Sequence, residues 1–101
     1  MIQVNKKELE EMKLNGDKIL VDFYGTWCGP CKSLMPLLES IEGEYPSVKF
    51  VKMDVDQNRD YIMDIGIRSV PTVMVFNGGD LVNSSAGLNN AMFYKGILNT
   101  L

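Results

Sequence analysis

The chain of 101 residues contains no histidine. This absence excludes hydrolytic sites in which histidine activates a serine or a cysteine, and it excludes every metal site with an imidazole ligand. Long apolar runs are also missing, because no stretch approaches the roughly 20 residues of a membrane-spanning helix. The opening stretch MIQVNKKELEEM lacks the basic and then apolar order of a secretory signal, so we expect a cytoplasmic protein outside the membrane.

Positive charge is scarce as well. Ten Lys and Arg residues against 13 Asp and Glu residues give a net charge of -3. Nucleic acids are bound by basic surfaces, so a nucleic-acid partner is not expected. The hydrophobic fraction of 46% is typical of soluble globular proteins, and the length fits a single domain over residues 1–101.

Only two cysteines are present, Cys28 and Cys31, three positions apart. A secreted disulfide scaffold would carry more cysteines, spread more widely along the chain. A bridge that closes so short a ring stabilises a fold by only about 2 kcal/mol in the chain-entropy treatment. The pair is therefore better suited to chemistry than to stabilising the structure.

Hydrophobic periodicity and turn residues predict strands and helices in the order βαβαβαββα. The expected strands cover residues 1–4, 18–24, 48–55, 72–76 and 81–84, and the expected helices cover residues 6–14, 30–45, 58–65 and 90–101. Alternation of strands and helices implies parallel pairing, and the Asn-Gly-Gly-Asp turn at residues 77–80 implies an antiparallel hairpin. We therefore expect an α/β fold, with a central mixed β-sheet flanked by helices on both faces.

Local signals refine three of these helices. Asn5 followed by Glu8 predicts a capping box at the first helix, and Asn89 is the expected N-cap of the last. Pro36 lies inside the second helix, where it removes a backbone hydrogen bond and should kink the axis.

The stretch Trp27-Cys28-Gly29-Pro30-Cys31-Lys32 follows a predicted strand and begins a predicted helix. A C-x-x-C pair in this setting is typical of a redox-active dithiol. Cys28 falls at the helix N-terminus, where free N–H groups and the helix dipole favour a thiolate. Pro30 suits the first helical turn, and Gly29 leaves room for a substrate backbone. Cys31 should lie one turn inside, on the same face and shielded.

Other uses of the two cysteines remain open. They could be buried core residues, although the Gly-Pro pair between them marks a helix start. A zinc site needs four ligands, so two sulfurs without an imidazole would require a second copy of the chain. Haem attachment would need histidine at the position of Lys32. We expect no metal.

The stretch VDFYGTWCGPCK at residues 21–32 resembles the signature of the thioredoxin family nearly throughout. Residues 54–58 and 66–72 match the next two landmarks of that family at the right distances. The resemblance covers essentially the whole chain and implies the thioredoxin fold. The chain departs from the family pattern at Tyr24, where many relatives carry Trp, and at Ser69, where Gly is frequent.

The resemblance implies roles for residues around the dithiol. Asp22, inside an apolar strand, would be a buried proton acceptor for the inner thiol, and burial should raise its pKa. Lys52 would be the partner of that carboxylate, and the bond before Pro71 would be cis, leaving the Val70 backbone free to pair with an extended substrate. The residues expected to line a shallow apolar groove are Trp27, Gly29, Pro30, Val70, Pro71, Ala86 and Gly87.

Each assignment has a plainer alternative. A charged residue on a strand can simply face solvent, which would remove the roles given to Asp22 and Lys52. Trp27 can pack in the core, although its loop of small residues favours exposure.

The resemblance implies a thiol–disulfide oxidoreductase that reduces protein disulfides. Cys28 would attack a substrate disulfide, and Cys31 would resolve the mixed disulfide, leaving a Cys28–Cys31 disulfide. No bound cofactor is implied, because electrons would come from a thioredoxin reductase, and we expect a monomer. Two alternatives stand beside this hypothesis: a binding or accessory subunit of a partner enzyme with an incidental dithiol, and an oxidant that installs disulfides.

Overall fold

The computed structural model describes all 101 residues and arranges them as five strands and four helices. The strands are β1 (Ile2–Gln3), β2 (Lys18–Tyr24), β3 (Val48–Asp54), β4 (Thr72–Asn77) and β5 (Asp80–Ala86). The helices are α1 (Lys6–Leu14), α2 (Gly29–Glu42), α3 (Arg59–Asp64) and α4 (Ala91–Leu98). The element order predicted from the sequence is confirmed. No helix is both long enough and apolar enough to cross a membrane.

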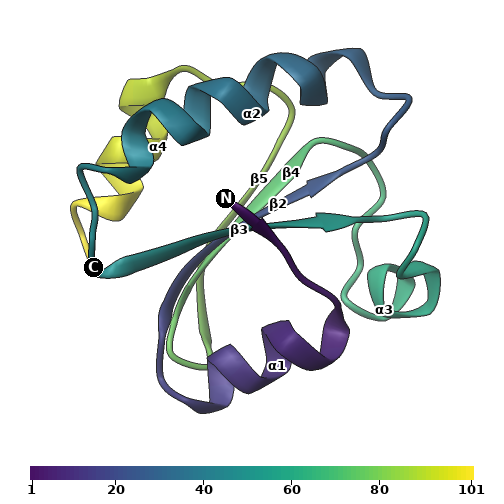
Figure 1. Ribbon diagram of the computed structural model, residues 1–101, viewed down its shortest axis with the longest axis horizontal. Helices are drawn as coiled ribbons and strands as arrows, with labels where there is room; N and C mark the ends of the chain where they lie inside the picture. The colour runs from purple at the N-terminus through teal and green to yellow at the C-terminus, as the bar shows by residue number, and fades with distance from the viewer.

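The strands form one mixed sheet in the order β1-β3-β2-β4-β5. β1, β3 and β2 are parallel, whereas β4 runs antiparallel to both β2 and β5. Helices α2 and α4 cover one face of the sheet, and α1 and α3 lie on the other (Figure 1). This arrangement confirms the predicted mixed sheet with helices on both faces.

The sheet separates two buried apolar layers. Leu20 and Leu38 belong to the layer beneath α2 and α4, and Leu9 and Phe23 belong to the layer that α1 and α3 cover. Successive side chains of a strand point to opposite faces, so Asp22 shares the face of Leu20. The one carboxylate inside β2 therefore faces the side of the sheet that carries α2.

Several element ends differ from the prediction by one or two residues, and α2 and α4 end three residues earlier than predicted. β1 has two residues instead of four. α2 ends at Glu42 rather than at Tyr45, because the next N–H groups, of Glu44 and Tyr45, donate to carbonyls three residues back. The last helix likewise ends at Leu98 and continues as tighter turns. An apolar stripe persists through such turns, so periodicity alone places a helix end too late.

The predicted caps are half confirmed. Asn5 and Glu8 form the expected capping box at α1, with distances of 2.9 and 3.0 Å between side-chain oxygen and backbone nitrogen. The prediction of Asn89 as the N-cap of α4 is wrong. Asn90 occupies that position, with an extended backbone and a side chain that accepts from the Phe93 N–H at 2.9 Å.

The proline inside the second helix does not end it. α2 continues through Pro36 without a break.

Candidate active site

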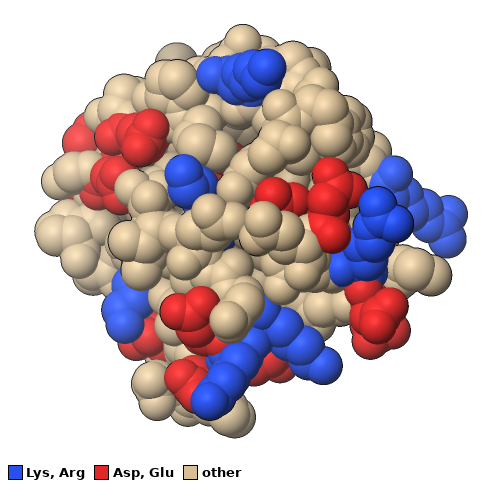
Figure 2. All heavy atoms as spheres, turned by 45° about the vertical axis from the view of Figure 1, so that its right-hand side comes forward, with Lys and Arg blue, Asp and Glu red and all other residues tan.

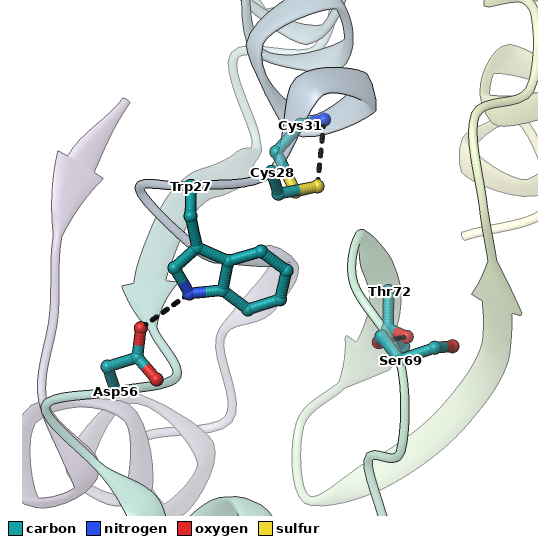
Figure 3. The surroundings of a disulfide bond; sticks show 6 residues. All are labelled: Trp27, Cys28, Cys31, Asp56, Ser69 and Thr72. Atoms are coloured by element: carbon teal, nitrogen blue, oxygen red, sulfur yellow. Dashed lines mark hydrogen bonds between the residues drawn. A yellow bond between two sulfur atoms is a disulfide. The ribbon is translucent and has the colours of Figure 1, made fainter.

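The two cysteines form a disulfide at the first turn of α2. Cys28 is the N-cap, with an extended backbone, and Cys31 lies inside the helix with a Cα–Cα separation of 5.3 Å. The backbone N–H of Cys31 donates to Cys28 Sγ at 3.2 Å (Figure 3). A free helical N–H is thus already directed at the sulfur that would carry the negative charge of a thiolate. The predicted position of Cys28 at the helix start is confirmed.

Both cysteines are covered in the disulfide form. Cys28 is 4% exposed and Cys31 is 2% exposed. The shielding expected for Cys31 is confirmed, and the structure shows that Cys28 is nearly as enclosed. A turn between the Cys28 N–H and the Gly25 carbonyl, 3.1 Å apart, folds the preceding loop against the helix start.

Trp27 lies at the surface beside the disulfide, with 67% of the residue exposed. Its indole Nε1 donates to Asp56 Oδ2 at 2.7 Å (Figure 3). The Asp56 N–H in turn donates to Asp54 Oδ1 at 2.8 Å, which fixes the loop after β3. The core alternative for Trp27 is therefore excluded, and an acidic loop from another strand holds the indole in place.

Two residues of this arrangement were missed by the sequence reasoning. Asp56 lies in a stretch that matches the family, but no sequence signal places that stretch against Trp27. Gly25 packs so closely under the indole that an added Cβ would lie 2.7 Å from the Trp27 ring. The only sequence signal for Gly25 is a glycine two positions before Trp27, and its role depends on where the tryptophan ring packs.

Asp22 is fully buried, and neither carboxylate oxygen has a hydrogen-bond partner. Burial raises the pKa of Asp22 to about 7, against the opposing attraction of the Lys52 ammonium. Lys52 is half-buried and lies directly opposite Asp22 in the β2–β3 register. The solvent-facing alternative is excluded for Asp22. No oxygen of that carboxylate lies within 4.0 Å of the Lys52 nitrogen, so the two interact through space without a direct ion pair.

The segment before β4 lies across from the disulfide (Figure 3). The Val70–Pro71 bond is cis, as predicted, and Pro71 is buried. Thr72 Oγ1 donates to the Ser69 carbonyl at 2.7 Å, and the Gly87 N–H donates to the Pro71 carbonyl at 2.8 Å. The first contact closes the turn that contains the cis bond, and the second joins the end of β5 to Pro71.

The expected groove is only partly visible in the surface. Trp27, Gly29, Pro30 and Ala86 are exposed, and Val70 and Gly87 are half-buried. These residues do not line a common cavity, because Ala86 is the only one of them that lines any cavity of the structure. Their role in holding a substrate stays a prediction.

Charge does not single out a ligand. Acidic and basic side chains are intermingled on the face drawn in Figure 2, with uncharged surface between them. No three His, Cys, Asp or Glu side chains are grouped so that they could hold a metal ion. The chemistry available at the site is that of two sulfurs, a buried carboxyl and an exposed indole.

Comparison with known proteins agrees with this chemistry. The family profile named Thioredoxin matches residues 1–98. Mitochondrial thioredoxin-3 of Saccharomyces cerevisiae is 38% identical over 93 residues, covering 92% of this chain and 73% of the yeast protein. Thioredoxin of Mycoplasmoides gallisepticum is 41% identical over 83 residues, covering 82% of this chain and 83% of that protein.

The fold has close counterparts among solved structures. A mutant thioredoxin from Halobacterium salinarum superposes with a TM-score of 0.88 at 33% identity, covering 98% of this chain and 88% of that one. Family members need no bound cofactor, because the cysteine pair itself is oxidised and reduced. With its C-x-x-C disulfide at the start of α2, the chain belongs to the thioredoxin family of thiol–disulfide oxidoreductases.

Proposed function

We propose that this protein acts as a reductant of protein disulfides, with Cys28 as the nucleophile and Cys31 as the resolving thiol. The position of Cys28 as N-cap, with the Cys31 N–H directed at its sulfur, carries this proposal. The Cys28 thiolate attacks one sulfur of the substrate disulfide, and the other substrate sulfur leaves with an electron pair. The Cys31 thiolate then attacks Cys28 Sγ and releases the second substrate sulfur. Two electrons pass to the substrate, and the Cys28–Cys31 disulfide remains.

Asp22 is the proposed proton acceptor for Cys31. A carboxyl whose pKa is about 7 is divided between its two protonation states at neutral pH, so it can take up a proton and release it again. It lies in the buried layer beneath α2, the helix that carries the inner cysteine. Lys52 favours the charged form from the neighbouring strand.

The surface around the disulfide is the proposed site for an extended substrate segment. The backbone of Val70 lies beside the cis bond and can pair with such a segment by adding it as a short strand. The residues assigned to this contact surface are Trp27, Gly29, Pro30, Val70, Pro71, Ala86 and Gly87. Asp56 joins them indirectly, because it orients the Trp27 indole.

The oxidised protein needs an electron source to work repeatedly. We propose a thioredoxin reductase as that source and a monomer in the cytoplasm as the working form. The test supplies a flavoprotein reductase with its nicotinamide donor and measures whether insulin disulfides are cleaved over many turnovers. Failure to turn over, with the reductase active on another thioredoxin, would contradict the proposal.

Paired cysteine variants test the assigned roles. Cys28→Ser should abolish the reaction, whereas Cys31→Ser should trap the substrate as a mixed disulfide that mass spectrometry detects on Cys28. Equal loss in both variants without any adduct would overturn the assignment. A partner enzyme that binds the double variant as tightly as the parent would instead favour an accessory binding subunit.

A further inference from the structure

Lys52 is a half-buried lysine whose ammonium contacts no carboxylate within 4.0 Å. Its Nζ lies 3.7 Å from Met35 Sδ of α2 and 6.0 Å from the ring centroid of Tyr24 in β2. A thioether sulfur is a weak acceptor, and a ring face attracts a cation only modestly. The strongest acceptor nearby, Asp22, is left without a hydrogen bond.

The position of the Lys52 ammonium is explained by a contact with α2 rather than by the spacing of the strands. Asp22 and Lys52 are register partners on adjacent strands, a spacing that a flexible lysine side chain can bridge. The ammonium instead lies against the Met35 sulfur, which projects from the helix that also carries Cys31. The Lys52 ammonium therefore contacts α2 rather than the Asp22 carboxylate.

We propose that Met35 is a positioning residue that holds the Lys52 ammonium away from Asp22, and that oxidation of its thioether by a peroxide tightens this hold. The inference rests on the proposed role of Asp22 as the proton acceptor. Met35 is only partly buried, so a small peroxide can reach the sulfur. Neither the family signature nor the cysteine chemistry requires a methionine at this position.

The oxidation step is a simple oxygen transfer. The Met35 sulfur donates two electrons to hydrogen peroxide, the O–O bond breaks, one oxygen stays on sulfur as a sulfoxide, and water leaves. The sulfoxide oxygen is a stronger acceptor than the thioether, so it holds the Lys52 ammonium more tightly. Holding the ammonium away favours protonated Asp22 and reduces the fraction of Asp22 that can take a proton from Cys31.

Lys52 is the one charged group that acts measurably on Asp22, and Asp22 and Asp54 of β3 both act on Tyr24 of β2. Among the helices on this side of the sheet, α2 carries the two cysteines and the exposed Lys32 in its first turn, and α4 carries the buried Tyr94. β4 carries no ionisable residue. Lys52 Nζ is the polar group that lies against Met35 Sδ, so a change at that sulfur acts on Asp22 through Lys52.

The test compares Met35→Leu, which removes the acceptor, with Met35→Gln, which offers a stronger one. The midpoint of the Asp22 titration is measured by carbon-13 NMR and from the pH dependence of insulin reduction. We expect the Leu variant to lower the midpoint by about half a pH unit and the Gln variant to raise it by about as much. Met63→Leu, on the opposite face of the sheet, should leave it unchanged.

Peroxide provides the second arm. The disulfide form is treated with hydrogen peroxide and then reduced with dithiothreitol, and peptide mass mapping identifies the Met35 sulfoxide. The treated parent should show a raised midpoint, and the treated Met35→Leu variant should not change. Equal responses of the two proteins, or shifts of the Leu and Gln variants in the same direction, would overturn the inference.

Asp22→Asn separates this inference from the function on which it rests. If this variant keeps the parental pH profile of insulin reduction, the proton-acceptor role fails. A second outcome is that Asp22→Asn abolishes the pH midpoint of insulin reduction, while both Met35 variants keep the parental midpoint. In that case the role of Asp22 stands and only the inference about Met35 fails.

Discussion

At the scale of single residues, Asp22 is a fully buried carboxyl whose oxygens have no hydrogen-bond partner. An ionised carboxyl without hydrogen bonds is unfavourable in an apolar layer, and burial accordingly raises its pKa to about 7. In the unfolded chain the Asp22 carboxyl is protonated only below about pH 4, whereas in the folded chain it stays protonated up to about pH 7. The folded state therefore loses stability as the pH rises between these two values.

Replacing Asp22 by Asn should remove this pH dependence. The difference between the ordinary pKa of 3.8 and the raised value of about 7 corresponds to about 4 kcal/mol at full ionisation. Urea unfolding of the oxidised parent at pH 4 and pH 8 should show a loss of this order that the variant lacks. Asp17→Asn, which removes a carboxylate paired with Lys49 at the surface, should keep the parental loss. A parental decline in Asp22→Asn would contradict the argument.

Trp27 is the only tryptophan, so its fluorescence reports directly on the contact with Asp56. Asp56→Ala removes the acceptor of the indole N–H and should lower the fluorescence anisotropy and slow insulin reduction several-fold. The free energy of unfolding should fall by less than about 1 kcal/mol, because the hydrogen bond is exposed. Asp56→Asn keeps an acceptor oxygen and should retain the parental anisotropy, and equal behaviour of the two variants would count against the contact.

At the scale of secondary-structure elements, α1 and α3 are joined by a hydrogen bond between residues far apart in the chain. Tyr61 Oη donates to Glu10 Oε2 at 2.6 Å, and Lys13 Nζ lies 3.1 Å from the same oxygen. The hydrogen bond from Tyr61 is the main cause of the lowered pKa of Glu10, because it favours the charged form of the carboxyl. The stabilisation is therefore present above the ordinary pKa of Glu10 and is lost as the pH falls through the lowered value.

Tyr61→Phe should destabilise the protein by about 1 kcal/mol at neutral pH, because the hydrogen bond to a charged acceptor is partly exposed. The difference from the parent should shrink when unfolding is measured below about pH 4, where Glu10 is protonated in the unfolded chain. Tyr45→Phe is a matched control, since it removes a hydroxyl that donates to the neutral Asn99 side chain. A pH-independent loss in Tyr61→Phe would show that the Glu10 charge is not involved.

At the scale of the whole molecule, the two apolar layers share the same central strands. One face of the central strands β2, β3 and β4 packs against α2 and α4, and the other face packs against α1 and α3. If one apolar layer unfolds, the strands that support the other layer are therefore disturbed as well. We propose that residues 1–101 form one domain that unfolds as a unit, as small domains commonly do.

Leu38→Ala tests this proposal in the layer beneath α2. The side chain is fully buried, so its truncation should cost roughly 2–5 kcal/mol, the range of comparable core truncations. Far-ultraviolet circular dichroism and Trp27 fluorescence should still give coincident transitions. Leu14→Ala, at a residue that is 87% exposed, should change stability by less than about 0.5 kcal/mol. Two separate transitions in Leu38→Ala would show that the layers unfold independently.

Patterns within short stretches of the sequence predict several features of this protein. Alternating periodicities predict the element order, the Cys28–Cys31 spacing before Pro30 predicts a dithiol at a helix start, and the apolar neighbours of Asp22 predict its burial. Each of these features depends on residues close together in the chain, where backbone geometry follows from residue type. The helix ends and the N-cap of α4, predicted at Asn89 and found at Asn90, were less accurate, because a shift of one residue or one tighter turn leaves the apolar pattern unchanged.

Contacts between residues far apart in the sequence arise only from the packing of the folded chain. The contacts of Trp27 with Asp56, of Lys52 with Met35 and of Tyr61 with Glu10 join different elements, separated by 17 to 51 positions. No local pattern contains such pairs, because they depend on how the helices and the loop after β3 pack on the sheet. The protonation of the buried carboxyl and the orientation of the indole therefore follow from packing, whereas the reacting sulfurs follow from the motif.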